Sequence, residues 1–92
     1  MSTQFSGILA AVVTPLTADG SAVDPDGIKR QAEHIIGGGI NGLVPGGSTG
    51  EFTTLSTDER KRATELYIEA AAGRVPVVAG TGALSTAETV EL

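Results

Sequence analysis

Two adjacent hydroxyl residues flanked by glycines are the clearest candidates for chemistry in this sequence. Ser48 and Thr49 lie in the segment Gly46–Phe52, which reads GGSTGEF. Because glycines let the backbone curl, such a segment presents N–H groups while the hydroxyls donate to an anion. The pattern predicts a loop that binds a carboxylate or a phosphate. The same residue types also suit a plain connection between a strand and a helix, so both interpretations stay open on local pattern alone.

Two nucleotide-binding motifs resemble parts of this chain, and neither is complete. A P-loop needs a lysine directly before its hydroxyl residue, whereas Gly47 precedes Ser48. The segment Gly80–Ser85 reads GTGALS and resembles a dinucleotide fingerprint, but serine replaces the third glycine. A small flavodoxin-like nucleotide binder is therefore a weaker alternative, and it would require a reversal of strand order.

The other polar side chains are better explained by structure than by chemistry. His34 has no second His or Cys with which to share a metal, so we expect a histidine at the surface or in helix packing. Glu51 adjoins the hydroxyl residues, and its carboxylate either belongs to the site or anchors the loop by accepting backbone hydrogen bonds. The sequence predicts no metal site and no cofactor.

Composition narrows the class of protein and its partners. The 92 residues carry a net charge of −5 with only six basic residues, which argues against nucleic acid as a partner. No apolar run approaches the length of a membrane span, and Met1–Ser6 lacks the basic start of a signal peptide. Cysteine is absent, which excludes disulfides and a thiolate nucleophile. We therefore expect a cytoplasmic protein with a small-molecule partner.

The elements that must position the hydroxyl residues alternate between strands and helices. The apolar run Ile8–Thr14 predicts a strand buried on both faces, and Gly42–Pro45 predicts a second strand. Between them, Asp24 and a following proline open a helix that glycines end at Gly37–Gly39. This order of elements predicts a βαβ unit.

The same unit then repeats along the chain. Ser56 and Glu59 form a capping box for a second helix that ends near Gly73. Val75–Ala79 predicts a third buried strand, and Ser85 with Glu88 predicts a second capping box that opens a third helix, inside which the sequence stops at Leu92. Since the carboxyl ends of parallel strands meet at one edge, Thr14–Pro15, the glycine-flanked loop and Gly80–Gly82 are expected to lie together.

Five stretches of the chain carry a resemblance to a known family. They are VVTPL (Val12–Leu16), DG (Asp19–Gly20), GINGLVPGGSTGE (Gly39–Glu51), LSTDER (Leu55–Arg60) and RVPVVAGTG (Arg74–Gly82). In this order and spacing they resemble the N-terminal third of the dihydrodipicolinate synthase and N-acetylneuraminate lyase family. These are the pyruvate-dependent class I aldolases and dehydratases.

The resemblance implies that residues 1–92 are the N-terminal segment of a single TIM (βα)8 barrel domain. They would form its first three βα units and end within the third helix. It also implies that a lysine on the sixth strand, beyond Leu92, forms a Schiff base with pyruvate or another 2-oxo acid. Lys29 and Lys61 lie on predicted helices in the wrong units for that role. A homo-oligomer is likewise expected from the resemblance.

By motif match, Ser48 and Thr49 hold the carboxylate of the 2-oxo acid, and Ser48 also joins a tyrosine proton relay. Ser48 is thus the candidate catalytic residue, whereas Tyr67 does not match the relay tyrosine. A synthase acting in lysine biosynthesis is the first choice of activity. A sialic acid lyase and a sugar-acid aldolase remain open.

A second hypothesis is a non-catalytic barrel fragment or assembly module. Three βα units leave the outer strands without partners, and exposed strand edges recruit other chains. Under this hypothesis Val12 and Val78 are expected to be partly uncovered and the chain to self-associate.

Overall fold

Strands and helices alternate along the chain in a computed structural model that describes residues 7–92. Met1–Ser6, for which the sequence predicts no signal peptide, lie outside the described residues. In chain order the elements are β1 (Leu9–Ala11), α1 (Pro25–Gly37), β2 (Gly42–Val44), the 3₁₀ helix η1 (Phe52–Thr54), α2 (Thr57–Ala71) and α3 (Thr86–Glu91). The α/β class expected from the sequence is confirmed.

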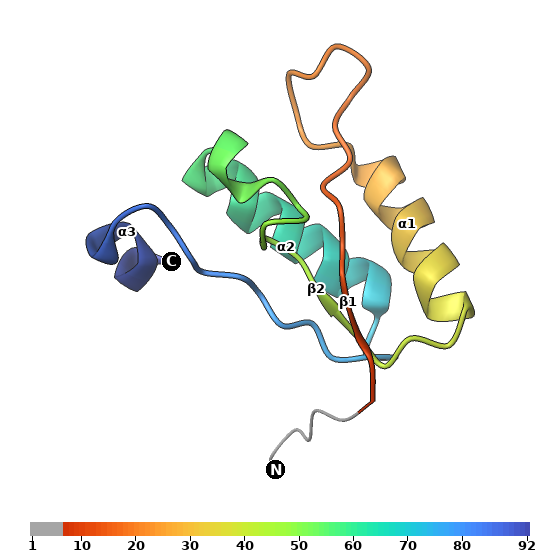
Figure 1. Cartoon of the computed structure of the whole chain (residues 1–92). Helices are drawn as coiled ribbons and strands as arrows, with labels where there is room; N and C mark the ends of the chain where they lie inside the picture. Colours follow the sequence, from red (N-terminus) through yellow and green to blue (C-terminus); the bar gives the residue numbers. More distant parts are fainter. Residues whose placement is uncertain (1–6) are drawn as a thin grey trace.

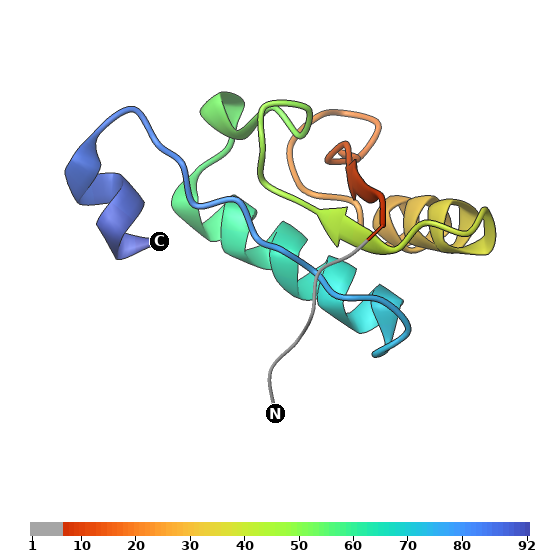
Figure 2. The ribbon, with the colours of Figure 1, turned by 60° about the horizontal axis from the view of Figure 1, so that its bottom comes forward.

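The sheet is parallel, and β2 lies in its middle. β1 pairs with β2 in a register that places Leu9 opposite Gly42. On the other side of β2, the Leu43 N–H donates to the Pro76 carbonyl at 3.0 Å, and the Val78 N–H donates to the Leu43 carbonyl at 2.8 Å. The three segments follow one another in sequence order across the sheet (Figures 1 and 2). Within residues 7–92 the sheet lacks the order reversal that a flavodoxin-like fold requires.

The prediction of a third buried strand over Val75–Ala79 is wrong in extent and burial. Only Val77 in this stretch forms a β-bridge, which pairs it with Leu43, and residues 75–78 are half-buried. Pro76 has no N–H to donate to a ladder. Within residues 7–92 this extended segment pairs only with β2, so a buried strand does not form here.

The prediction that the first strand is buried on both faces is also wrong. Ile8, just before β1, is 70% exposed. Val12 is only 1% exposed, whereas Val13 next to it is 44% exposed. Successive side chains of a strand point to opposite faces, and here the helices cover only one of them. The expectation that Val12 is partly uncovered is therefore wrong, since Val12 points to the covered face. Val78 is half-buried, as expected.

The helices begin where the capping residues predict. The Asp24 carboxylate accepts a hydrogen bond from the Asp26 N–H at 3.1 Å at the start of α1. At α2 the capping box is complete: Ser56 Oγ accepts from the Glu59 N–H at 3.1 Å, and the Glu59 carboxylate accepts from the Ser56 N–H at 2.8 Å. At α3, Ser85 Oγ accepts from the Glu88 N–H at 3.2 Å, which is one of the two hydrogen bonds of the predicted capping box. These caps fix where each helix leaves its preceding loop.

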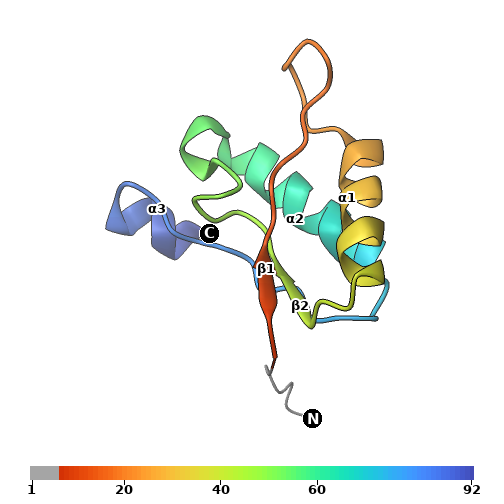
Figure 3. The same ribbon diagram turned by 45° about the vertical axis from the view of Figure 1, so that its right-hand side comes forward.

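The core lies between the strands and the pair of helices α1 and α2. The two helices run side by side on one face of the strands (Figure 3). Aliphatic residues and one tyrosine fill the space between these layers: Val12, Val23, Ile28, Ala32, Leu43, Ala63, Leu66, Tyr67 and Ala71. Packing of the two helices on the strands thereby holds the strand-end loops at one edge of the sheet.

Candidate active site at the strand ends

The glycine-flanked loop directly follows β2 and is built from successive tight turns. The Gly50 N–H donates to the Gly47 carbonyl at 3.1 Å, and the Glu51 N–H donates to the Ser48 carbonyl at 3.0 Å. Glu51 has a left-handed backbone (φ 58°), which is uncommon for a residue other than glycine. Ser48 and Thr49 lie on the turn with both residues exposed. The loop thus presents the two hydroxyl residues outward from the edge of the sheet.

The end of the first strand holds this loop through Thr14. Its hydroxyl donates to the Gly50 carbonyl at 2.8 Å. A Cβ atom on Gly50 would lie 2.9 Å from Thr14 Oγ1 and 3.2 Å from the Val12 carbonyl oxygen, so the approach requires glycine. The predicted meeting of Thr14 with the glycine-flanked loop is confirmed.

The third predicted strand end also meets the loop. The Gly80 N–H donates to the Pro45 carbonyl at 2.8 Å. A Cβ atom on Gly80 would lie 2.6 Å from the Gly46 carbonyl oxygen, closer than real atoms pack. Segments that lie more than 30 residues apart in sequence are therefore in backbone contact here. All three strand-end segments predicted to carry chemistry gather at one edge.

Arg60 is the residue of this site that sequence reasoning missed. It lies near the start of α2, is only 6% exposed and donates to three backbone carbonyls at the strand ends. Its Nη1 donates to Gly82 at 2.6 Å, and its Nη2 donates to Gly80 at 2.9 Å and to Gly46 at 3.3 Å. Its guanidinium carbon also lies 4.8 Å from the centre of the Phe52 ring.

A signal for Arg60 was present in the sequence. Arg60, Ala63 and Tyr67 follow helical spacing i, i+3 and i+7, so the arginine lies on the same face as buried residues. An arginine on the buried face of a helix needs acceptors, and backbone carbonyls at strand ends supply them.

Tyr67 is a core residue that ties α2 to the end of the first strand. Its ring is fully buried, and its hydroxyl donates to the Val13 carbonyl at 2.7 Å. Burial raises the pKa of Tyr67 to about 12, because the charged phenolate is poorly solvated there. This hydrogen bond commits the phenol to a backbone carbonyl, and the expectation that Tyr67 is not the relay tyrosine stays a prediction.

The remaining candidates lie where the sequence placed them. His34 is exposed in the last turn of α1. Lys29 and Lys61 are exposed on α1 and α2, as expected, and Lys61 lines a surface pocket with Gly80 and Thr81. The backbone carbonyl of Glu51 accepts the Thr54 hydroxyl at 2.8 Å, and the predicted anchoring by its carboxylate stays a prediction. Residues 7–92 contain no group of three or more His, Cys, Asp or Glu side chains placed to bind a metal.

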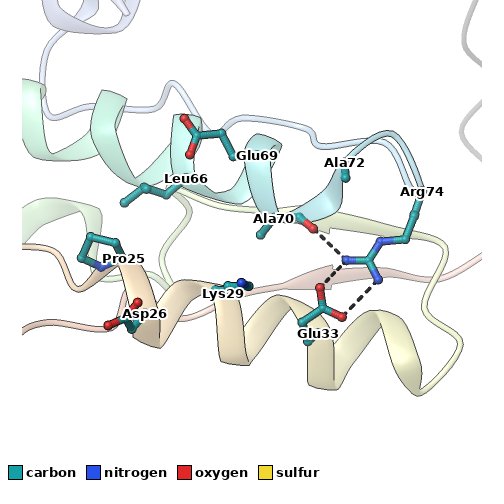
Figure 4. A pocket seen from close by; sticks show the side chains of 9 residues that line it. All are labelled: Pro25, Asp26, Lys29, Glu33, Leu66, Glu69, Ala70, Ala72 and Arg74. Atoms are coloured by element: carbon teal, nitrogen blue, oxygen red, sulfur yellow. Dashed lines mark hydrogen bonds and ion pairs between the residues drawn. The ribbon is translucent and has the colours of Figure 1, made fainter.

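A groove on the described surface lies elsewhere, between α1 and α2 (Figure 4). It measures about 490 Å³ and is crossed by an ion pair in which Arg74 donates to both carboxylate oxygens of Glu33, at 2.7 and 3.1 Å. Arg74 also donates to the Ala70 carbonyl at 2.7 Å. The hydrogen bonds from Arg74 lower the pKa of the Glu33 carboxyl. These contacts join α1 to the end of α2, so the groove is a seam between helices.

None of the helices described over residues 7–92 combines the length and the apolarity required to cross a bilayer.

The described part of the chain is an α/β protein whose polar loops gather at the carboxyl ends of parallel strands. Residues 4–92 match the Dihydrodipicolinate synthetase family, and the chain belongs to this family. The resemblance expected from the five sequence stretches is thereby confirmed.

One related protein of known sequence is named as a synthase. The 4-hydroxy-tetrahydrodipicolinate synthase of Sorangium cellulosum (strain So ce56) is 52% identical over 87 residues, which cover 95% of this chain and 29% of that protein. The chain therefore spans less than a third of the length of that relative.

Solved structures share the same arrangement of elements. A prophage protein of the dihydrodipicolinic acid synthase family from E. coli K12, in complex with pyruvate, matches with a TM-score of 0.88 and 39% identity over 97% of this chain and 30% of its own. N-acetylneuraminate lyase from Mycoplasma synoviae matches with a TM-score of 0.85 and 39% identity over 95% of this chain and 30% of its own. Family membership thus covers both synthases and lyases.

Proposed function

We propose that this chain forms the N-terminal part of a Schiff-base lyase or synthase acting on pyruvate or another 2-oxo acid. One observation carries the proposal: in a member of this family, the exposed residues Ser48 and Thr49 lie on the turn where three strand ends meet. The pyruvate complex of the related prophage protein supports a 2-oxo acid as the ligand.

In the proposed site the two hydroxyls donate hydrogen bonds to the carboxylate of the 2-oxo acid. Holding that carboxylate orients the carbonyl carbon toward the amine that attacks it. The attack then becomes effectively unimolecular, because the two reacting groups are already in place. Ser48 additionally passes a proton through the tyrosine relay of the family. The lysine that forms the Schiff base and the relay tyrosine belong to strands beyond Leu92.

A 4-hydroxy-tetrahydrodipicolinate synthase is the activity we propose first, because relatives such as the 52% identical protein carry that name. N-acetylneuraminate lyase is the second candidate, since a solved lyase shares both the fold and 39% of the sequence. In either case we propose a TIM (βα)8 barrel of which residues 1–92 form the first three units. A cytoplasmic homo-oligomer is part of the same proposal.

Trapping with borohydride tests the proposal directly. The segment is expressed within a polypeptide of its relatives' full length, incubated with pyruvate and reduced. We expect a covalent adduct on a lysine beyond residue 92, because reduction of an iminium fixes the substrate to the amine. The 92-residue chain treated in the same way is the control and is expected to trap nothing. An adduct on Lys29 or Lys61 that accompanies turnover would contradict the assignment.

A further inference from the structure

The guanidinium of Arg60 contacts both ends of the loop that carries the hydroxyl residues. Nη2 donates to the Gly46 carbonyl at the start of that loop, at 3.3 Å. The guanidinium carbon lies 4.8 Å from the centre of the Phe52 ring, at the other end of the segment Gly46–Phe52. Ser48 and Thr49 lie between these two contacts in the sequence, so a single side chain contacts the segment on both sides of the hydroxyl residues.

The same guanidinium also holds the end of the third strand segment. Its two terminal nitrogens donate to the Gly80 and Gly82 carbonyls at 2.9 and 2.6 Å. A planar fork with fixed donor directions can hold several acceptors at once in a defined arrangement. The two strand-end loops are thereby fastened to one rigid group and through it to α2.

The orientation of Arg60 is set by these carbonyls. The side chain is buried, and its Nε has no hydrogen-bond partner within residues 7–92. A buried charge without a carboxylate partner is costly unless other groups solvate it, which here are three carbonyls and one aromatic face. The capping box at Ser56 and Glu59 fixes the first turn of α2, from which Arg60 extends.

We propose that Arg60 is a positioning residue of the 2-oxo acid site, which fastens the loop carrying Ser48 and Thr49 to the segment Gly80–Gly82. It acts through the loop and does not itself touch the ligand. This inference rests on the proposed function, since the loop is the part of that site present in this chain. Loss of the guanidinium releases the loop while the core behind it stays packed.

Substitution of Arg60 in the full-length protein tests the proposal through two independent measurements. In Arg60→Met we expect the KM for pyruvate to rise at least about tenfold, because misplaced donors bind the carboxylate poorly. Arg60→Lys keeps the charge and one donor group, so it is expected to recover part of that loss. Arg62→Met is the matched control, since Arg62 lies on the same helix with a half-exposed side chain and pairs only loosely with Glu65 at 3.8 Å.

The KM measurement separates positioning from stability. A variant that merely folds less well has fewer active molecules, which lowers the apparent kcat and leaves KM unchanged. Unchanged KM in both Arg60 variants would therefore overturn the proposal. If Arg60→Met fails to fold, Arg60→Lys decides the question alone, because an intact KM there would show that the fork geometry is not needed.

Hydrogen exchange without ligand gives the second measurement. Amides of Gly46–Glu51 and Gly80–Gly82 are expected to exchange faster in Arg60→Met than in Arg62→Met, while amides in α1 keep their protection. Equal exchange in both loops would overturn the proposal. A parent protein that traps no pyruvate would refute the proposed function, and the exchange experiment would still decide whether Arg60 fastens the two loops.

Discussion

Ser48 and Thr49 are adjacent but are expected to contribute differently to the proposed reaction. A hydrogen bond to a charged group contributes about 1.5 to 3 kcal/mol, and a positioned proton-transfer group contributes roughly 10² to 10⁴ in rate. In the full-length protein, Ser48→Ala is therefore expected to lower kcat substantially. Thr49→Val is expected chiefly to raise the KM for the 2-oxo acid. Steady-state kinetics of both variants will measure the difference.

Both variants are expected to remain folded, because the two residues are exposed on a strand-end turn. Circular dichroism of each variant provides the control for folding. A folded Ser48→Ala protein with the kcat and KM of the parent would remove the role assigned to this loop.

Ionisation of Tyr67 is expected to lower the stability of the fold at alkaline pH. Its folded pKa is raised from 10.0 to about 12, so the folded state keeps the phenolic proton after the unfolded state has lost it. The contribution of Tyr67 to the free energy of unfolding is complete below pH 10 and is lost as the pH rises through the folded pKa. We expect the parent to lose stability between these values more steeply than Tyr67→Phe. Denaturant unfolding at several pH values will compare them.

At neutral pH the same substitution reports on the hydrogen bond. Tyr67→Phe leaves the Val13 carbonyl without its donor, which is expected to cost about 0.5 to 1.5 kcal/mol. Parallel pH dependence in the two proteins would show that the phenol ionises as freely in the fold as in the unfolded chain.

Element boundaries that depend on local chemistry were predictable from the sequence. Asp24, Ser56 and Ser85 each cap the helix assigned to them, because a cap acts through a hydrogen bond to an N–H two or three residues away. The glycine-flanked loop was likewise found from its own residues. These features need no knowledge of distant parts of the chain.

Two features that depend on distant neighbours were missed, although the meeting of the three strand ends was predicted. The apolar run Val75–Ala79 has the composition of a buried strand, yet the strand needs partners on both sides to become one. The role of Arg60 depends on carbonyls of Gly46, Gly80 and Gly82, between 14 and 22 residues away in sequence. Neither the pairing nor these acceptors can be read from a local pattern.

The contact between Gly46 and Gly80 predicts the effect of a single added methyl group. In Gly80→Ala the new Cβ would lie 2.6 Å from the Gly46 carbonyl oxygen, so the two loops must separate. We expect a loss of about 1 to 3 kcal/mol in stability and weaker 2-oxo acid binding. Thermal unfolding and KM for pyruvate in the full-length protein will measure both effects.

Gly82→Ala is the matched control for this change. A Cβ on Gly82 meets no atom within 4 Å, although the residue lies only two positions further along the chain. It is expected to match the parent in stability and KM. If Gly80→Ala also matches the parent, the close approach of the two loops does not constrain the site.

At the scale of the whole molecule, one face of the strands is left uncovered. The helices pack on the side of Val12, whereas Val13 on the outer side is 44% exposed. β1 pairs only with β2, so its other edge presents free backbone groups within residues 7–92. In the proposed barrel this edge and face would be covered by further strands of the same domain.

The 92-residue chain on its own is therefore expected to self-associate or to be marginally ordered. Uncovered apolar side chains and strand edges favour pairing with other copies, while the net charge of −5 opposes it. Added salt screens that repulsion, so association should strengthen as ionic strength rises. Light scattering over a salt series will measure the association, and hydrogen exchange will measure order in the strands. A monodisperse monomer with strongly protected amides in β1, β2 and residues 75–79 would show that this part of the fold is self-sufficient.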